Sequence, residues 1–303
     1  MTELLALVER QERIQQICKD NALDFTIHKI PLYGVFEDEP INSSYYGLLN
    51  DKTKQIIHSV KEGYRVTQTD EIIGLALDGT QKFPNLTVSK GGSINGGRKT
   101  FIQFQINGMN KINGEDIKRF ITIMDSNDGS TRLMVGIGNK VMSCMNQYHY
   151  FAAAAQSRFK HSASIEEKLD ELPLLIEAAL ATDIRLMEIY TELADKTCSR
   201  DLIDTLVHRL VGCDRTMSKE DLAEMSMVSQ NKMNKLYDHI AKETREKGMN
   251  LWGVQNGVTS WTSHDKSVPR RPNGRDESAM VGSNYETNNK SLAFVMARGD
   301  ISW

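Results

Sequence analysis

Few cysteines, few prolines and no long apolar run characterise this sequence. The four cysteines are far apart and form no CxxC pair, so we expect free thiols in a reducing compartment rather than a zinc site or a disulfide framework. No segment approaches the roughly 20 apolar residues that span a bilayer, and the acidic residues near the N-terminus do not fit a secretory signal. The sequence therefore predicts a protein without a membrane partner.

Signatures of catalysis and of nucleotide binding are also missing. The sequence contains no GxxxxGK[ST], HExxH or GxSxG motif. Gly136 and Gly138 lie between predicted strands, and the third glycine of a dinucleotide fingerprint does not follow them. The turn that begins at Asp125 has glycine at its fifth position and glycine at its twelfth, whereas an EF-hand loop requires glycine at the sixth and glutamate at the twelfth. We therefore expect no enzyme activity, no cofactor and no metal site.

Alternating hydrophobicity predicts an antiparallel sheet in the middle of the chain. Residues 120–124 are mostly apolar, residues 125–129 read Asp-Ser-Asn-Asp-Gly, and residues 133–137 alternate, which is the strongest hairpin signal in the sequence. Segments 87–94 and 99–106 flank a second turn, and a further strand is expected over 141–145. Before the sheet, the pattern predicts a helix over 3–20, strands over 25–30, 54–60 and 64–67, a turn-rich stretch over 33–50 and a helix over 71–77.

After the sheet the hydrophobic period changes from two residues to about 3.6. Helices are expected over 147–156, 164–195, 199–212, 218–248, 251–262 and 287–297, with a kink or restart at Pro173. Residues 263–285 are polar and predict a long exposed loop. The expected fold class is α+β, with a helix-led antiparallel sheet domain over residues 1–160, basic from about residue 82, followed by a mainly α-helical domain over residues 161–303.

Charge is unevenly distributed along the chain. The net charge is −3, yet residues 82–161 contain eleven Lys and Arg against four Asp and Glu, so the remainder carries a net −10. Cations on a sheet with amides between them suit a groove that follows a nucleic-acid backbone. The alternative is that these charges only keep the sheet soluble.

The predicted interface consists of cationic side chains on the expected strands, on their turns and after residue 156: Lys90, Arg98, Lys99, Lys118, Arg119, Arg132, Lys140, Arg158, Lys160 and His161. Aromatic side chains in the same part of the chain are candidates for stacking on bases: Phe101, Phe104, Tyr148, Tyr150 and Phe159. The alternative for the aromatic residues is a place in the hydrophobic core.

Several short motifs occur in a fixed order: YRVTQT at 64–69, SINGGR at 93–98, DSNDGS at 125–130, CMN at 144–146, FKHS at 159–162 and WGVQNGVT at 252–259. Together, over about residues 25–297, they resemble the phage/plasmid-like protein family, a domain-of-unknown-function family of phages and plasmids. The resemblance implies a phage or mobile-element origin, expression in the bacterial host cytoplasm and an association with replication and recombination genes. It supplies no catalytic residues.

Charge and resemblance together predict a non-enzymatic protein of phage replication or recombination that binds nucleic acid, single-stranded DNA above all. By comparison with single-strand annealing proteins we also expect a homo-oligomer. The alternative function is a phage protein that inhibits or redirects a host complex, for example a defence complex, through its acidic helical part.

Overall fold

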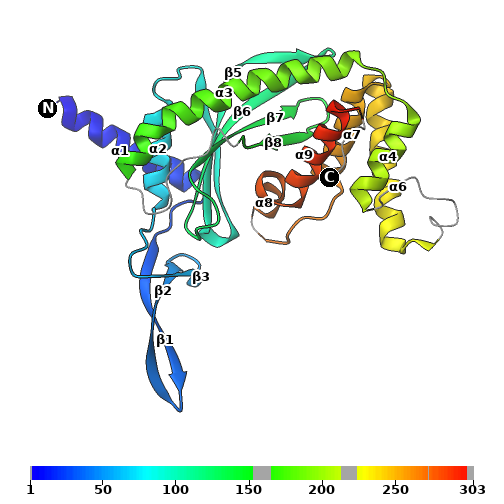
Figure 1. The fold of residues 1–303 in the computed structure, drawn as a ribbon. Coiled ribbons are helices and arrows are strands. Elements are labelled where there is room, and N and C mark those ends of the chain that lie inside the picture. The colour runs from blue at the N-terminus through cyan, green and yellow to red at the C-terminus, as the bar shows by residue number, and fades with distance from the viewer. Residues whose placement is uncertain (1, 153–164, 213–223, 272, 299–303) are drawn as a thin grey trace.

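The computed structural model describes residues 2–152, 165–212, 224–271 and 273–298. Figure 1 shows two antiparallel sheets and a set of helices, which confirms the α+β class predicted from the sequence. One sheet has five strands in the order β4-β5-β6-β7-β8, and the other has three strands in the order β1-β2-β3. Most of the helical chain follows the sheets in sequence, as expected.

The five-stranded sheet consists of β4 (Leu86–Ile94), β5 (Lys99–Ile112), β6 (Glu115–Ser126), β7 (Met134–Val141) and β8 (Gln147–Tyr150). Two of its hairpins, β4–β5 and β6–β7, form where the sequence predicts hairpins. The short 3-10 turn η1 (Asn95–Gly97) joins the first pair, and Gly129 adopts a φ of 70° in the turn between the second.

The segment after β7 differs from the prediction. Residues 142–146 form a turn instead of a strand, because the amide of Met145 donates to the carbonyl oxygen of Val141 and the amide of Val141 donates to that of Asn146. Residues 147–150 form β8 instead of the start of a helix, because pairing with β7 satisfies their backbone groups. The remainder of that predicted helix, from residue 153, lies outside the described residues.

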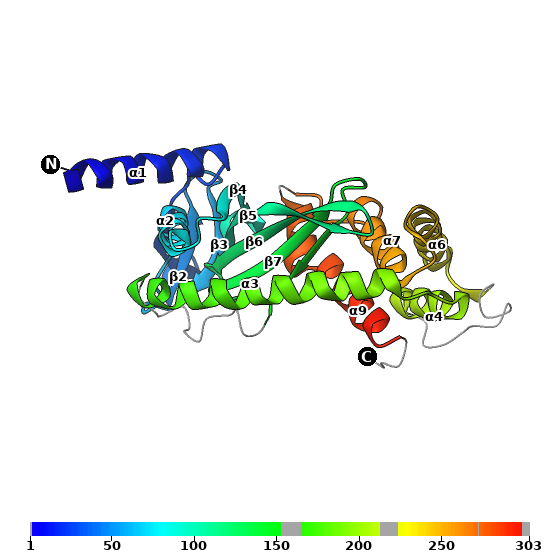
Figure 2. The same ribbon diagram turned by 90° about the horizontal axis from the view of Figure 1, so that it is seen from above.

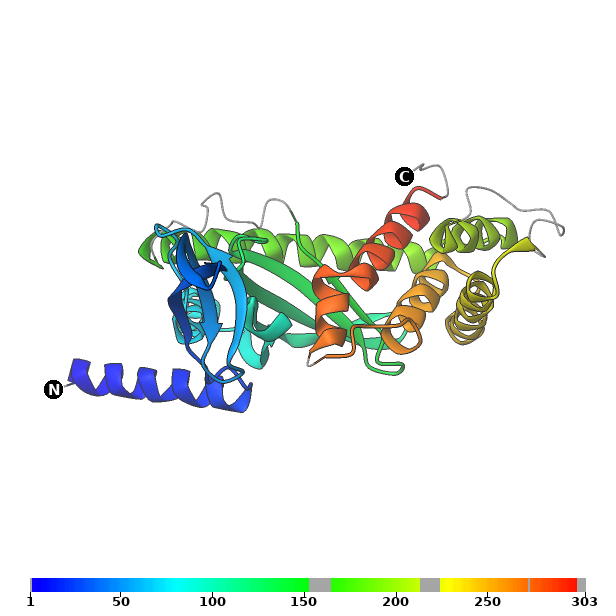
Figure 3. The same ribbon diagram turned by 90° about the horizontal axis from the view of Figure 1, so that it is seen from below.

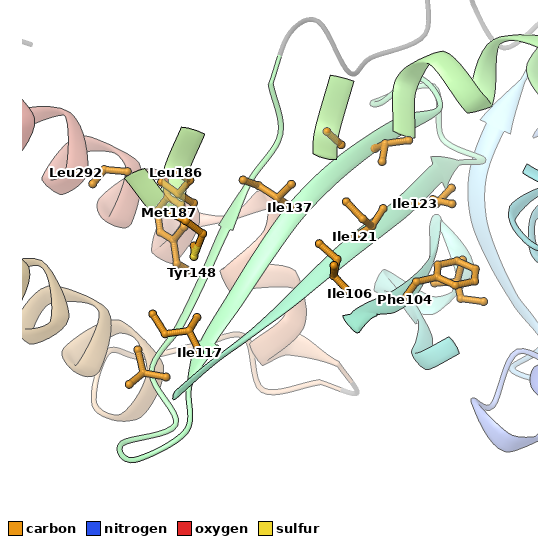
Figure 4. Packing of buried hydrophobic residues seen from close by; sticks show 14 of the residues in the cluster. Phe104, Ile106, Ile117, Ile121, Ile123, Ile137, Tyr148, Leu186, Met187 and Leu292 are labelled. Carbon is orange, nitrogen blue, oxygen red and sulfur yellow. The ribbon is translucent and has the colours of Figure 1, made fainter. Parts of the chain in front are cut away.

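Side chains of one face of this sheet build the main core. Ile106 of β5, Ile121 of β6 and Ile137 of β7 are at most 4% exposed and belong to the same hydrophobic cluster as Leu186 and Met187 of α3 (Ile165–Asp195), which lie beside Tyr148 in Figure 4. Seen from above in Figure 2, α3 runs along the sheet and reaches from α2 (Thr69–Thr80) to α4 (Arg200–Val211). Helix α3 is one element through Pro173, where the sequence predicts a kink or a restart.

The helices at the other end are α4, α6 (Met227–Lys247), α7 (Leu251–His264), α8 (Gly274–Val281) and α9 (Ser283–Met296). Ser199 caps α4 by accepting a hydrogen bond from the amide of Leu202, and Gly212 ends it at a φ of 95°. The predicted start of the next helix at residue 218 lies outside the described residues. The expectation of a long exposed loop over 263–285 is wrong, because α8 occupies residues 274–281 and buries Met280 against the sheet.

One hydrophobic cluster includes side chains from Ile14 to Val295 and combines the sheet with the helices. The two regions predicted as residues 1–160 and 161–303 therefore share a core. None of the described helices combines the length and the apolar composition needed to cross a membrane.

A long hairpin projects from the rest of the protein. It is formed by β1 (Ile27–Phe36) and β2 (Glu39–Asn50), and β3 (Gln55–Val60) pairs with the base of β2. Figure 1 shows its tip far from the five-stranded sheet, and Figure 2 shows the N-terminal helix α1 (Thr2–Asp20) projecting past α2. The sequence predicts only turns over 33–50, so this hairpin is the largest difference from the expected fold.

Candidate nucleic-acid interface

The face of the five-stranded sheet opposite α3 carries polar side chains. Cross-strand partners share a face, and side chains two residues apart on a strand do so as well. Gln103 is paired with Lys90 on one side and with Thr122 on the other, while Lys118 is paired with Lys140. Lysines from β4, β6 and β7 therefore lie on one face.

Helix α8 covers one end of this face and leaves the other end open. Met280 of α8 packs with Phe101, Met124 and Met134 in a second hydrophobic cluster. Figure 3 shows α8 and α9 from below, with α8 over the sheet and α9 extending to α3, where Leu292 lies beside Leu186 in Figure 4. The open end is therefore bordered by the helices that follow the sheet in sequence.

The open end is hollowed. A cavity of about 330 Å³ is lined by residues of all five strands and of α8: Ser89, Lys90, Gln103, Phe120, Asn139, Lys140, Gln147, His149 and Asp276. A neighbouring cavity of about 280 Å³ shares Lys140 and Gln147 and extends to Arg275 on α8 and to His264 on α7. Because the two cavities share lining residues, they form one hollow, which we call the sheet hollow.

Among the described residues, the sheet hollow is lined by Lys90, Lys140 and Arg275 against one carboxylate, and Lys118 lies next to it as the cross-strand partner of Lys140. Lys118 and Lys140 are direct cross-strand neighbours, an arrangement of like charges that destabilises a sheet. Neither has an acidic partner in the part of the chain that the structure describes. Burial lowers the pKa of Lys140 below its ordinary value, and the charges of Lys118 and Lys90 lower it further. An anion bound there would offset this repulsion.

Asp276 is the one carboxylate among the described residues that line the sheet hollow. Its oxygen atoms lie 2.7 and 2.8 Å from Nζ of Lys90 and attach α8 to β4. On the same helix, a guanidinium nitrogen of Arg275 donates to the carbonyl oxygen of Ser263. The lining thus contains binding groups and lacks a pair of carboxylates for acid–base chemistry.

His149 lies on the floor of the sheet hollow and is 5% exposed. Burial lowers its pKa to about 4, with a further contribution from the charge of Lys90, while Asp276 acts in the opposite direction. Its Nδ1 atom is buried without a hydrogen-bond partner. A Cβ atom at position 138 would lie 2.7 Å from this nitrogen, so glycine is needed there to admit the imidazole ring.

Phe120 is a half-buried aromatic residue of this face that the sequence analysis missed. It lies two residues from Lys118 on β6, and that spacing within a predicted strand was the available signal. Arg275 was also missed, because its segment was predicted to be a loop remote from the sheet.

Most of the predicted stacking residues lie elsewhere. Phe101, Phe104 and Tyr148 are at most 3% exposed, so the prediction that they stack on bases is wrong and the core alternative holds for them. Tyr150 is 37% exposed at the edge strand β8. Phe159 lies outside the described residues, as do Arg158, Lys160 and His161.

Arg119 is also unavailable to a phosphate. It lies on the core face of β6 and forms an ion pair of 2.7 Å with Asp183 of α3, whose side chain is 2% exposed. Burial raises the pKa of Asp183, and Arg119 opposes that effect. The prediction for Arg119 failed because neighbouring residues of a strand face opposite sides, so Arg119 cannot share a surface with Lys118.

The remaining predicted cations gather near the turn between β6 and β7. The side chain of Lys99 is 12% exposed, and its Nζ lies 4.0 Å from Asp128 and donates to Ser130. Arg98 is partly exposed and Arg132 is exposed in the same area. The structure therefore brings Lys90, Lys118 and Lys140 together and separates them from Arg98, Lys99 and Arg132.

No curated protein and no solved structure matches this chain. A family model described as "Domain of unknown function (DUF932)" matches residues 56–286. The matched segment contains the whole five-stranded sheet, α3, α7 and α8, begins after the β1–β2 hairpin and ends in the first turn of α9. Because the match covers most of the sequence, the chain belongs to the DUF932 family, whose shared domain is one of unknown function.

Proposed function

We propose that this protein binds single-stranded nucleic acid, DNA above all, in the sheet hollow and has no enzymatic activity of its own. The observation that carries the proposal is the cross-strand pair of Lys118 and Lys140, which has no acidic partner among the described residues. The positive charge of Lys90 also lowers the pKa of Lys140. A phosphate backbone supplies regularly spaced negative charge and would neutralise these lysines.

Single strands fit this surface better than a duplex. Phe120 offers a partly exposed ring and Gln147 a partly exposed amide at the same hollow, where the buried amide of Gln103 donates to Thr122. Aromatic rings stack on bases only when the bases are unstacked from their neighbours, as they are in a single strand. A duplex would present phosphates alone to the lysines.

The biological setting that we propose comes from the sequence motifs that resemble the phage/plasmid-like family. It is the replication or recombination of a phage or another mobile element in the cytoplasm of a bacterial host. We also propose that the protein forms a homo-oligomer, because single-strand annealing proteins hold unstacked strands as multimers.

The test is fluorescence anisotropy with a labelled 30-mer, single-stranded and duplex, over a salt series. Four contacts, from Lys90, Lys118, Lys140 and Arg275, give a slope of log K against log salt of about −3 for a single strand. Removing two of them by Lys118→Gln and Lys140→Gln should flatten the slope by about 1.4.

Lys111→Gln is the matched control, since Lys111 is 68% exposed at the far tip of β5. It should leave the slope unchanged. The proposal fails if single strands do not bind at 50 mM salt, or if the double variant of Lys118 and Lys140 binds as the unmodified protein does.

A further inference from the structure

The outer part of the β1–β2 hairpin, residues 31–46, is a second surface that is suited to bind a partner. We call it the arm. Tyr33, Val35 and Phe36 are 62%, 76% and 63% exposed, and Ile41 is 51% exposed. Figure 1 shows the arm extending beyond β3 and away from the five-stranded sheet and the helices. Large apolar side chains gathered on one exposed element mark a contact site rather than ordinary surface.

Both faces of the arm are apolar. Val35 is paired with Pro40 on one face, while Gly34 is paired with Ile41 on the other, where Phe36 also lies. A two-stranded hairpin without cover is marginally stable in water. The arm therefore suits insertion between surfaces of a partner more than contact through a single face.

The charge of the arm restricts the kind of partner. Residues 30–50 contain Glu37, Asp38 and Glu39 and no lysine, arginine or histidine. These acids form the exposed tip, where Glu37 and Asp38 adopt positive φ angles of 48° and 63° in the hairpin turn. Phosphates of nucleic acid and anionic lipid headgroups would be repelled, so the complementary surface is a basic and partly apolar protein surface.

This chain presents such a surface. A shallow hollow of about 640 Å³ lies between β3 and the turn that joins β6 to β7. Tyr64 supplies partly exposed apolar area above the buried Val60, while His58, Lys61 and Arg132 supply basic groups. Asp128 is the one acid among the described lining residues. We call this hollow the turn hollow.

We propose that the arm of one copy docks in the turn hollow of a second copy, with the acidic tip against Lys61. The arm cannot reach its own turn hollow, because β3 pairs with the base of β2 and the arm points away from it. A contact between two different surfaces is head-to-tail, and it joins copies into a closed ring or an open chain. The contact uses none of the residues of the sheet hollow, so it stands or falls separately from nucleic-acid binding.

The first experiment measures the mass of the full chain by light scattering after size-exclusion chromatography at micromolar concentration. The unmodified protein should be larger than a monomer, and the variant with Val35→Ser and Phe36→Ser should be a monomer. Leu174→Ser is the matched control, because Leu174 is an apolar residue of α3 that is 64% exposed; it should leave the mass unchanged.

Circular dichroism of each variant verifies that it is folded. A monomeric unmodified protein at tens of micromolar would overturn the proposal, as would an assembly that persists in the variant with Val35→Ser and Phe36→Ser. That variant should still bind a labelled single strand if the sheet hollow is the nucleic-acid site, which separates a failure of this inference from a failure of the proposed function.

The second experiment locates the contact. Unlabelled and ¹⁵N-labelled chains are mixed and treated with a zero-length reagent that condenses a carboxylate with an amine. Cross-linked peptides that join Glu37, Asp38 or Glu39 of one isotope to Lys61 of the other should appear. Reversing the tip with Glu37→Lys and Asp38→Lys should dissociate the assembly, and adding Lys61→Glu should restore it. An assembly without cross-links to Lys61 would exclude the turn hollow as the docking site.

Discussion

His149 connects the sheet hollow to the stability of the fold. Its pKa of about 4 in the folded state lies below the ordinary 6.5, because burial disfavours the imidazolium. As the pH falls, the unfolded chain binds a proton first, so the free energy of unfolding decreases from about pH 6.5 down to about pH 4.

We expect this residue to contribute a slope of up to about 1.4 kcal/mol per pH unit, on the order of 3 kcal/mol over that window. Urea denaturation at several pH values checks the expectation by comparing the unmodified protein with the variant His149→Gln. The variant should lose less stability on acidification. Parallel curves for the two proteins would show that His149 does not carry the effect.

Phe120 tests the contact with bases separately from the contact with phosphates. Phe120→Leu keeps an apolar side chain beside the sheet hollow but removes the flat ring. Base stacking contributes about 1–3 kcal/mol per base, so affinity for a single strand should fall by one to two powers of ten while the salt slope stays the same.

An abasic strand of equal length is the control for the Phe120 measurement. It carries the same phosphates, so it should bind the unmodified protein and the Phe120→Leu variant equally. Equal affinity of the two proteins for the normal strand would mean that Phe120 contacts no base, and a change in slope would mean that the substitution disturbed the lysines.

At the scale of elements, segments with one buried face were predictable. The β4–β5 and β6–β7 hairpins alternate apolar and polar residues because one face packs against α3. The ends of α4 were predictable because Ser199 and Gly212 are residue types that commonly begin and end helices. The arm gives no such signal. Both of its faces are exposed to solvent, so no buried face requires apolar and polar residues to alternate along its strands.

The candidate site was predictable only in part, for a related reason. Lys118 and Lys140 were identified as cations of neighbouring strands. The face on which each side chain lies depends on strand register, and for that reason Arg119 was wrongly predicted to lie on the same face as Lys118. Helix α8 was expected to be a loop, because its stability depends on Met280 packing against β5, β6 and β7 rather than on its short polar sequence. Contacts between distant segments therefore determine which side chains border the sheet hollow.

At the scale of the whole molecule, the sheet and the helices are joined by a buried ion cluster as well as by the common core. Nζ of Lys247 on α6 lies 2.6 Å from Glu115 of β6 and 3.1 Å from Glu243 of its own helix. The side chains of Lys247 and Glu243 are 3% and 0% exposed. Loss of the lysine would leave two carboxylates without their cation in a place from which water is excluded.

We expect Lys247→Met to cost about 3–5 kcal/mol and to destabilise both parts together. Hydrogen–deuterium exchange measured by mass spectrometry should show reduced protection in peptides of β5 and β6 and, equally, in peptides of α6 and α7. Lys242→Met on the exposed side of the same helix is the control, and it should change neither set. If Lys247→Met lowered protection in α6 and α7 alone, the sheet and the helices would be separate folding units, since a shared core requires that the loss of one contact between them be felt on both sides.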